Sequence, residues 1–346
     1  MGANENIQRR LAQIGERQNL SRDESRTLFE SIMTGEATDA QIGAVLMGLK
    51  VKGETVDEIT GAVEAMRGLS EKVAVERTYL VDTCGTGGSG ASKLFNISTA
   101  AAFVAAAAGA HVAKHGNRGM TSKSGSADVL EAAGVNLNLT PAQIGRCVHE
   151  AGVGFMFAPA HHRALKHAAG ARKELGTRTI FNLVAPLTNP ASAPNQVIGV
   201  FAPERMETLA QVLQQLGSRH VMLVHADGLD ELSIAGPSDV VELRNGRITR
   251  FRISPSDFGI ETASLDGLSA DSPLASLELL NQALGEPESA AAQIVALNAG
   301  AAIYVSGVAT SLTNGVTMAQ DAIASGLARE RLAELVRITA MMAETQ

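Results

Sequence analysis

The feature that most restricts the fold is an alternation, from residue 79 onward, of short β-type apolar runs with longer runs of helical periodicity. Strands that alternate with helices build a mostly parallel sheet with helices on its faces. An Asn245-Gly246 pair between two β-rich runs adds an antiparallel hairpin, which we expect at an edge of the sheet. The expected strands are 79–83, 111–114, 153–157, 197–201 and 220–225, and the expected helices are 97–108, 141–151, 204–216 and 290–305.

The first 70 residues follow a different pattern, because capping boxes introduce helical apolar patterns there. The boxes are Ser21/Glu24, Thr38/Gln41 and Thr55/Glu58, and the apolar residues behind them are Leu28, Ile32, Ile42, Val45, Leu46, Leu49, Ile59, Val63 and Met66. Each apolar set lies on one helix face. The predicted fold class is therefore α/β, with a small helical domain before a larger domain built on a mostly parallel central sheet flanked by helices.

The composition restricts the compartment and the ligands. The 346 residues include 29 Lys+Arg and 36 Asp+Glu, a net charge of −7 that repels nucleic acid and acidic membranes at long range. Cys84 and Cys147 have no paired spacing, so neither a disulfide framework nor a zinc cluster is indicated. The N-terminus is polar, and the longest apolar run, 100–110, is too short to cross a bilayer. We expect a cytoplasmic protein of one large domain or two.

A glycine-rich loop at 82–90 follows the first expected strand and leads toward a helix. Its glycines either cradle a phosphate, which the N–H groups of a helix start favour, or make only a tight turn. They fit the dinucleotide pattern G-x-G-x-x-G, yet no acidic residue stands between Asp82 and Asp128 to bind a ribose. A Walker A loop fails as well, because Ala91 stands where the pattern needs Lys.

A second segment suited to phosphate is 114–126, KHGNRGMTSKSGS. It follows the second expected strand, and it supplies Lys and Arg charges together with Ser and Thr hydroxyls. Ligands of parallel sheets bind at the carboxyl ends of the strands, and charged donors bind phosphate strongly. Two such segments on successive strands predict a ligand with two separated phosphate groups.

In its motifs the chain resembles the anthranilate phosphoribosyltransferase family, whose fold is similar to that of the pyrimidine nucleoside phosphorylases. The motifs occur in family order: GTGG (85–88), NIST (96–99), KHGNR (114–118), SKSGSAD (122–128), RTIFNL with PLTNPA (178–191) and GLDELS (228–233). The resemblance implies transfer of the phosphoribosyl group of phosphoribosyl pyrophosphate (PRPP) to the amino group of anthranilate, in tryptophan biosynthesis. It also implies a Mg²⁺ cofactor, a homodimer formed through the helical domain, a helical domain of 1–72 completed by about 162–189, and an α/β domain of 78–160 and 190–346.

Residue by residue, the resemblance assigns PRPP to the glycine loop, the helix start and the basic segment. These residues are Gly85, Gly88, Ser89, Asn96, Ile97, Ser98, Thr99, Lys114, His115, Gly116, Asn117, Arg118, Gly119, Met120, Thr121, Ser122 and Ser126. Magnesium is assigned to Ser98, Asp230 and Glu231, in agreement with the preference of Mg²⁺ for a few hard oxygen ligands. Taken without the family, Asp230 and Glu231 would instead fit a solvent-facing loop.

The resemblance places anthranilate near Asn117, His162, Arg172 and Pro186, with Gly85 close by. Arg172 suits the carboxylate of an aromatic acid, whereas His162 taken alone would more often be a structural or exposed histidine. The chain departs from the usual family pattern at Ser89, where Asp is usual, and on the acceptor side at Arg163, Leu165, Gly170 and Ala185.

The predicted reaction needs no strong general base, because an aromatic amine is already neutral and nucleophilic at neutral pH. We expect catalysis by positioning of both ligands across the ribose C1, while Mg²⁺, Lys114 and backbone N–H groups stabilise the departing pyrophosphate. Two alternatives stay open. One is an enzyme like the pyrimidine nucleoside phosphorylases, and the other is a nucleic-acid-binding paralogue without this activity.

Overall fold

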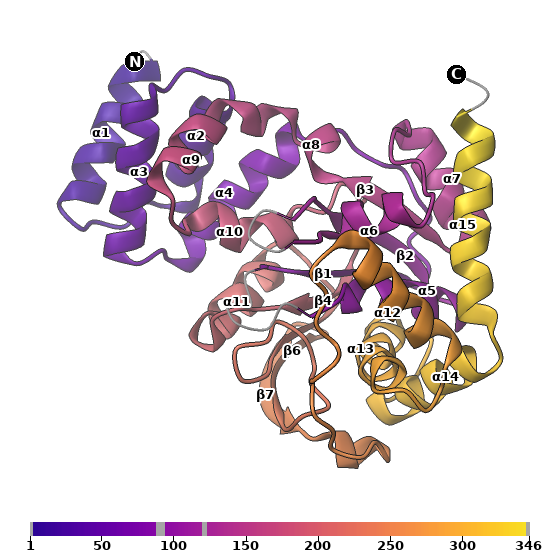
Figure 1. The fold of residues 1–346 in the computed structure, drawn as a ribbon. Coiled ribbons are helices and arrows are strands. Elements are labelled where there is room, and N and C mark those ends of the chain that lie inside the picture. Colours follow the sequence, from indigo (N-terminus) through magenta and orange to yellow (C-terminus); the bar gives the residue numbers. More distant parts are fainter. Residues whose placement is uncertain (1–2, 88–93, 120–122, 344–346) are drawn as a thin grey trace.

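The computed structural model describes residues 3–87, 94–119 and 123–343, which form an N-terminal group of helices beside a larger α/β part (Figure 1). Each predicted capping box is present, and its Ser or Thr side chain accepts a hydrogen bond from the backbone three residues later. Such caps satisfy N–H groups that a helix start leaves unpaired. The apolar residues predicted behind the boxes are all buried. These first helices are α1 (Ala3–Gly15), α2 (Arg22–Met33), α3 (Asp39–Lys52) and α4 (Val56–Leu69).

The α/β part contains a seven-stranded sheet with the order β3-β2-β1-β4-β5-β6-β7. In this order, neighbouring strands from β3 through β2, β1 and β4 to β5 are parallel. Strand β6 is antiparallel to β5, and β7 is antiparallel to β6. The predicted hairpin is confirmed at the sheet edge, where Asn245 and Gly246 take the positive φ values, 51° and 75°, that a type I′ turn requires. The strands are β1 (Leu80–Gly85), β2 (His111–Gly116), β3 (Val153–Phe157), β4 (Asn195–Gly199), β5 (His220–His225), β6 (Ser238–Arg244) and β7 (Arg247–Ile253).

The fourth strand is displaced from its predicted position of 197–201, because it begins with two polar residues. Asn195 donates from Nδ2 to the carbonyl of Leu80 at 2.8 Å, and Gln196 donates from Nε2 to the carbonyl of Pro186 at 3.0 Å. Both side chains are buried and donate to backbone carbonyls, which a pattern of hydrophobicity does not reveal. The predicted start of the helix 204–216 was also wrong, because a 3₁₀ turn occupies that position and the helix begins after it.

The sheet separates two hydrophobic cores. Successive strand residues point to opposite faces, so Val197 lies in one core and Ile198 in the other. Helices α5 and α13 fill one face, and α11 with the N-terminal helices fills the other, as expected for parallel strands. The helices that follow α4 in the chain are α5 (Ile97–Ala107), α6 (Ser126–Ala132), α7 (Pro141–Ala151), α8 (Ala158–His161), α9 (Lys166–Leu175), α10 (Ile180–Val184), α11 (Met206–Gln215), α12 (Pro273–Gly285), α13 (Ala290–Ser306), α14 (Leu312–Ala324) and α15 (Leu327–Ala343). Between them are 3₁₀ turns at Arg163–Leu165, Ala185–Leu187, Pro203–Arg205 and Pro255–Phe258.

Helices α9 and α10 pack on the N-terminal helices although they follow β3 in the chain (Figure 1). The rings of Phe29 in α2 and Phe181 in α10 meet edge to face with centroids 5.7 Å apart. Ala168 and Ala171 of α9 belong to the same core. The segment that carries the predicted acceptor residues therefore lies between the N-terminal helices and the sheet.

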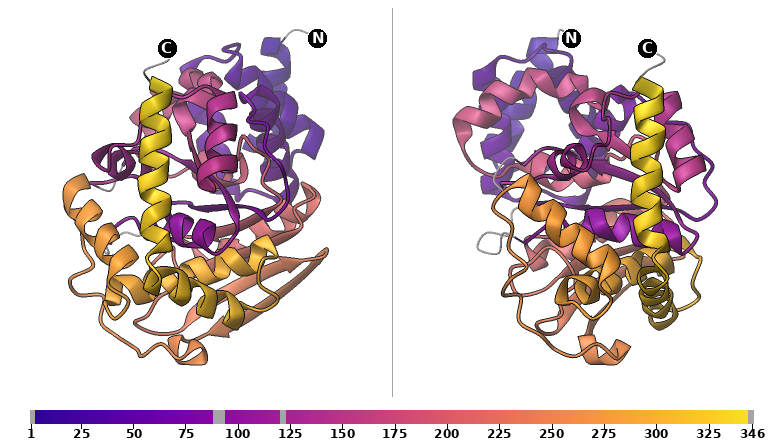
Figure 2. Two further views of the ribbon diagram at one scale, coloured as in Figure 1. Left: turned by 90° about the vertical axis from the view of Figure 1, so that its right-hand side faces the viewer. Right: turned by 45° about the vertical axis from the view of Figure 1, so that its right-hand side comes forward.

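The C-terminal helix α15 runs along the flank of the α/β part, where it packs beside α7 (Figure 2). In the described ranges of the chain, no single helix is both long enough and apolar enough to cross a membrane. The bent pair of α12 and α13 meets those two criteria in combination, and nearly all of α13 is buried.

Candidate functional site

The predicted glycine loop leaves the sheet where β1 and β4 end side by side, with Gly85 paired to Gly199. A Cβ atom at residue 199 would lie 1.6 Å from the backbone oxygen of Asp230, and one at residue 85 would lie 2.9 Å from its Oδ2. Glycine at both places lets the chain that carries Asp230 approach the strand ends. The N–H of Gly87 then donates to Oδ2 of Asp230 at 3.1 Å. The structure thus joins the glycine loop to the predicted metal site.

Asp230 and Glu231, which we call the acidic pair, have the electrostatics of a cation site. Desolvation raises the pKa of Glu231 to about 8, and the charge of Asp230 adds to the rise, while Lys114 and hydrogen bonds from Ser98 oppose it. Two repelling carboxylates beside a hydroxyl favour a cation. Among the described residues no group of three or more His, Cys, Asp and Glu side chains could hold a metal. The acidic pair fits Mg²⁺, which usually takes its remaining oxygens from water and phosphate.

Lys114 lies beneath these loops, with 2% of its surface exposed. Its Nζ donates to the carbonyl of Thr83 and, at 3.3 Å, to Oγ of Ser98. Burial lowers the pKa of Lys114, and the nearby carboxylates of Asp82 and Glu231 raise it. Lys114 therefore links β1, β2 and the start of α5, and its charge acts on the acidic pair.

The start of α5 is held by two serines, Ser124 of the predicted basic segment and Ser276 of α12, which the sequence did not indicate. Oδ1 of Asn96 accepts hydrogen bonds from Oγ of Ser124 at 2.9 Å and from Oγ of Ser276 at 2.7 Å. The Asn96 amide thus ties the helix start to the basic segment and to α12. The neighbouring predicted residues Ile97 and Thr99 are buried, and Ser98 is the residue of this turn that reaches Glu231.

The basic segment after Gly116 is only partly placed as predicted. Oγ of Ser126 donates to the carbonyl of Asn117 at 3.3 Å, which brings these two residues together. The guanidinium of Arg118 instead turns toward α6, where it pairs with two carboxylates, Asp128 among them at 3.1 Å. The N–H of Gly119 donates to the same aspartate at 2.9 Å. The predicted residues Gly88, Ser89, Met120, Thr121 and Ser122 lie outside the described residues.

His115 is buried behind the segment, and its ring meets that of His162 at a centroid distance of 5.1 Å. Desolvation lowers the pKa of both rings, that of His162 to about 4, so both are neutral at pH 7. The N–H of His115 donates to Oδ1 of Asp82 at 3.1 Å, and Nδ2 of Asn189 donates to Oδ2 of Asp82 at 2.7 Å. This buried network connects strand β1 of the donor side with the predicted acceptor segment.

The remaining predicted acceptor residues are Pro186, which is buried, and Arg172 in α9. The guanidinium of Arg172 lies 4.9 Å from the centroid of the Phe181 ring, and desolvation lowers the pKa of Arg172. Within the part of the chain that the structure describes, no carboxylate pairs with Arg172, and no hydrogen bond joins it to His162 or Pro186. An arginine supported on a ring in this way keeps its forked donors for a planar anion.

Comparison with known proteins agrees with this geometry. Residues 77–329 match the α/β domain of a glycosyl transferase family, and residues 8–70 match the helical bundle domain of that family. The chain is 57% identical to an anthranilate phosphoribosyltransferase of Saccharophagus degradans, over 97% of this chain and 100% of the relative. It is 56% identical to one of Teredinibacter turnerae, over 96% and 99%. The chain belongs to the anthranilate phosphoribosyltransferase family.

Solved structures of family members confirm the predicted fold class. The anthranilate phosphoribosyltransferase of Thermus thermophilus has a TM-score of 0.90 at 40% identity, covering 95% of this chain and 99% of that one. The enzyme of Saccharomyces cerevisiae, solved in complex with PRPP and Mg, has a TM-score of 0.83 at 24% identity over 93% of this chain and 94% of that one. At that identity the likeness is one of fold.

Departures from the family pattern on the acceptor side lie mostly at the surface. Arg163 is exposed, and its guanidinium lies 3.5 Å from the carboxylate of Glu71. Gly170 and Ala185 are exposed as well, whereas Leu165 is partly buried against the core of the N-terminal helices. The exposed side chain of Arg163 is thus paired with Glu71, although Arg163 directly follows the buried His162. Ser89 lies outside the described residues.

Several residues around the anthranilate phosphoribosyltransferase site went unpredicted: Asp82, Asn189, Ser276 and Asn298. The first two stand inside motifs that the sequence contains, but their pairing across the sheet has no local pattern. A signal for Asn298 was available, because it is an amide in the middle of a long apolar helical run.

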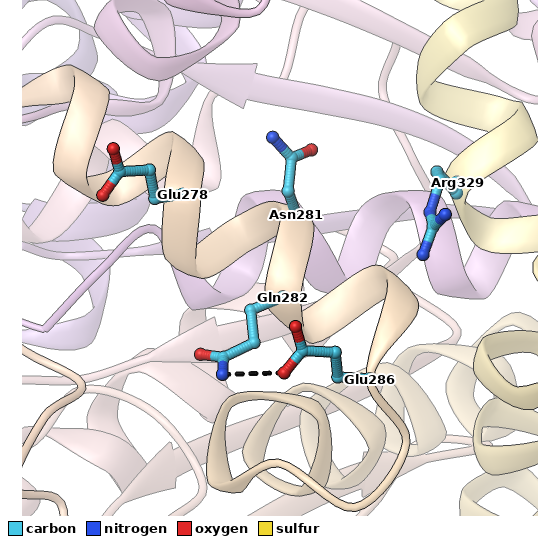
Figure 3. Close-up of a pocket in the computed structure, with 5 residues that line it drawn as sticks. All are labelled: Glu278, Asn281, Gln282, Glu286 and Arg329. Carbon is cyan, nitrogen blue, oxygen red and sulfur yellow. Dashed lines mark hydrogen bonds between the residues drawn. The ribbon is translucent and has the colours of Figure 1, made fainter.

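An open groove on another part of the molecule carries none of the predicted residues. It lies between α12 and α15 and is lined by Glu278, Asn281, Gln282, Glu286 and Arg329 (Figure 3). Nε2 of Gln282 donates to the carboxylate of Glu286 at 2.9 Å, one turn along the same helix. These are mostly exposed side chains of both charge signs, as on an ordinary solvated surface.

Proposed function

We propose that the chain transfers the phosphoribosyl group of PRPP to the amino group of anthranilate, giving N-(5-phosphoribosyl)anthranilate and pyrophosphate in tryptophan biosynthesis. The chain is then a pentosyltransferase. The observation that carries the proposal is the hydrogen bond from Gly87 to Asp230, which unites a phosphate loop and a cation site at the carboxyl edge of the sheet. Membership of the family supports the same reaction.

We assign Mg²⁺ to Ser98 and the acidic pair. Two carboxylates and a hydroxyl are hard oxygen donors of the kind this cation takes. When bound, Mg²⁺ supplies positive charge to the pyrophosphate as it leaves. The raised pKa of Glu231 makes its carboxyl easier to protonate than an ordinary glutamate, so a bound cation would compete with a proton there. The yeast enzyme of the same fold was solved with PRPP and Mg.

The chain's own donor-side groups bind and orient PRPP. Lys114 and the first turn of α5 direct positive charge toward the strand ends, where phosphates would lie. The amine lone pair of anthranilate forms the new N–C1 bond while the C1–O bond to pyrophosphate breaks, and its electrons leave with the oxygen. The amine then loses a proton to solvent, so no side chain has to act as a strong base.

On the acceptor side, we assign the carboxylate of anthranilate to Arg172 and its ring and amine to Asn117, His162 and Pro186. Because His162 is neutral at pH 7, it contributes a hydrogen bond or a wall and no charge. Gly85 lies beside this site and packs so closely against Asp230 that a Cβ atom there would lie 2.9 Å from Oδ2. Water is excluded where the acceptor segment meets the sheet, which protects PRPP from hydrolysis.

The two alternative functions gain no support. The two relatives described above, which match almost the full length of the chain, are anthranilate phosphoribosyltransferases. A nucleic-acid-binding paralogue would also have to overcome the net charge of −7.

We further propose a cytoplasmic homodimer that forms through the helical domain, 1–72 completed by about 162–189, with 78–160 and 190–346 as the α/β domain. The packing of α9 and α10 on α2, α3 and α4 supports this division. Size-exclusion chromatography with light scattering measures the assembly. A mass of one chain, 35.9 kDa, would contradict the dimer.

The reaction is tested by following the loss of anthranilate fluorescence with PRPP and Mg²⁺. We expect turnover in the wild type and its near-complete loss in Asp230→Asn and Glu231→Gln. Turnover of a substituted aromatic amine without turnover of anthranilate would make the acceptor wrong and leave the reaction class intact. Absence of turnover together with tight, salt-sensitive nucleic-acid binding would contradict the enzyme altogether.

A further inference from the structure

Helix α13 carries a buried amide, Asn298, between the core residues Leu297 and Ala299. Asn298 is 3% exposed. A buried amide destabilises a protein unless its donors and acceptor are paired. The partners of this side chain therefore show what it is used for.

Asn298 binds the backbone of Leu232 by two hydrogen bonds. Its Oδ1 accepts from the N–H of Leu232 at 2.9 Å, and its Nδ2 donates to the carbonyl of Leu232 at 2.9 Å. The second Nδ2 proton goes to the carbonyl of Ile294 at 2.9 Å, one turn earlier in α13. Because Oδ1 faces a donor and Nδ2 faces two acceptors, the amide has one satisfied orientation. It holds Leu232 in both position and direction.

Leu232 directly follows the acidic pair, and a tight turn directly precedes that pair. In the turn Ala226 and Leu229 exchange backbone hydrogen bonds of 2.9 and 2.8 Å, and the N–H of Gly228 donates to Nε2 of His225 at 3.2 Å. The acidic pair therefore sits between two anchored points of the loop that joins β5 to β6. Asn298 is the anchor on the C-terminal side.

We propose that Asn298 is a positioning residue for the metal site, which holds the acidic pair toward Ser98 without touching substrate. The inference rests on the proposed function, in which the acidic pair binds Mg²⁺. Contacts that orient metal ligands from outside usually change metal affinity by roughly 10–100-fold when they are removed. Asn298→Ala leaves both backbone groups of Leu232 without this partner, so the carboxylates lose their fixed placement.

The test measures Mn²⁺ binding by electron paramagnetic resonance and backbone hydrogen exchange of 230–233 in the metal-free protein. In Asn298→Ala we expect the Mn²⁺ dissociation constant to rise about tenfold or more and exchange at Leu232 to accelerate. Leu297→Ala is the matched control, since it removes core contacts from the same helix turn and should leave both quantities unchanged. Asn298→Ser, which keeps one hydroxyl, replaces the alanine variant if that variant does not fold.

Wild-type Mn²⁺ affinity and wild-type exchange in a folded Asn298 variant would overturn the inference. Equal losses of Mn²⁺ affinity in the Asn298 and Leu297 variants would overturn it too, because the effect would then be one of general stability. Asp230→Asn separates this inference from the proposed function. If Asp230→Asn binds Mn²⁺ like the wild type, the assignment of the metal to the acidic pair is wrong. Asn298 then has no positioning role toward a metal, even if its loss accelerates hydrogen exchange at Leu232.

Discussion

The donor side and the acceptor side of the site are built differently. On the donor side, Lys114 is bound to Thr83 and Ser98, and Asn96 is bound to two serines. On the acceptor side, the ring of His162 packs on His115 and has one hydrogen-bond contact among the described residues, 3.5 Å long, to the hydroxyl of Thr188. Arg172 rests on a ring with no carboxylate partner among those residues.

This difference predicts different kinetic roles. Groups that are fixed before the reaction stabilise developing charge without reorganising, so their loss lowers kcat. Groups with unused donors bind the substrate about equally in the ground state and the transition state, so their loss raises KM. A preorganised donor side and a looser acceptor side also allow the acceptor to vary while the transferred group stays the same.

The largest expected effect is that of Lys114→Ala. Removing the buried charge that we propose acts on the leaving group should lower kcat by on the order of 10³-fold, about 4 kcal/mol. Steady-state kinetics with varied PRPP measure it, and Lys123→Ala, an exposed lysine of the same segment, is the control that should behave like the wild type. If Lys114→Ala changes only KM and leaves kcat at the wild-type value, the predicted difference in kinetic role between the donor side and the acceptor side is wrong.

Next in size is Asn189→Ala, which removes the link between the sides. The substitution removes the hydrogen bond that Asn189 donates to the buried carboxylate of Asp82. The free energy of unfolding should therefore fall by about 2–3 kcal/mol. Urea denaturation measures this loss, with the exposed Asn281→Ala as the control. Unchanged stability would mean that the two sides are not coupled through Asp82.

Arg172→Ala should act on the acceptor alone. Loss of a charge-assisted pair should raise KM for anthranilate about 30-fold, about 2 kcal/mol, with little change in kcat or in KM for PRPP. Lys173→Ala, its exposed neighbour, should leave all three constants unchanged. If KM for PRPP rises equally, Arg172 belongs to the donor side, and the acceptor assignment is wrong.

The last prediction is a pH dependence of stability that comes from His162, which has no effect at neutral pH and grows as the pH falls. Its pKa is about 4 in the folded protein, against an ordinary value of 6.5, so the unfolded chain binds the extra proton first. Stability from this group is therefore constant above pH 6.5 and falls toward pH 4 by at most about 1.4 kcal/mol per pH unit. Denaturation between those pH values should show a shallower slope in His162→Gln, whereas the exposed His149→Gln should keep the wild-type slope.

Much of the fold was predictable because its signals are local. The capping boxes join residues three positions apart, and the hairpin turn depends on two adjacent residues. The start of β4 was missed because Asn195 and Gln196 are buried through hydrogen bonds to Leu80 and Pro186, which no local pattern encodes. Of the site, the glycine loop and Lys114 were predicted from chemistry, and the acidic pair only from a resemblance.

The sequence by itself determined that a glycine loop and a basic segment follow successive strands in an acid-free stretch, because residue type and order along a parallel sheet suffice for that. Tertiary structure decided that Gly87 meets Asp230, 143 residues away, that Asn298 binds Leu232, and that the pKa of Glu231 rises to about 8. The physical reason is the same in each case. Long-range hydrogen bonds and desolvation depend on which surfaces the packed helices and sheet bring together and shield from water.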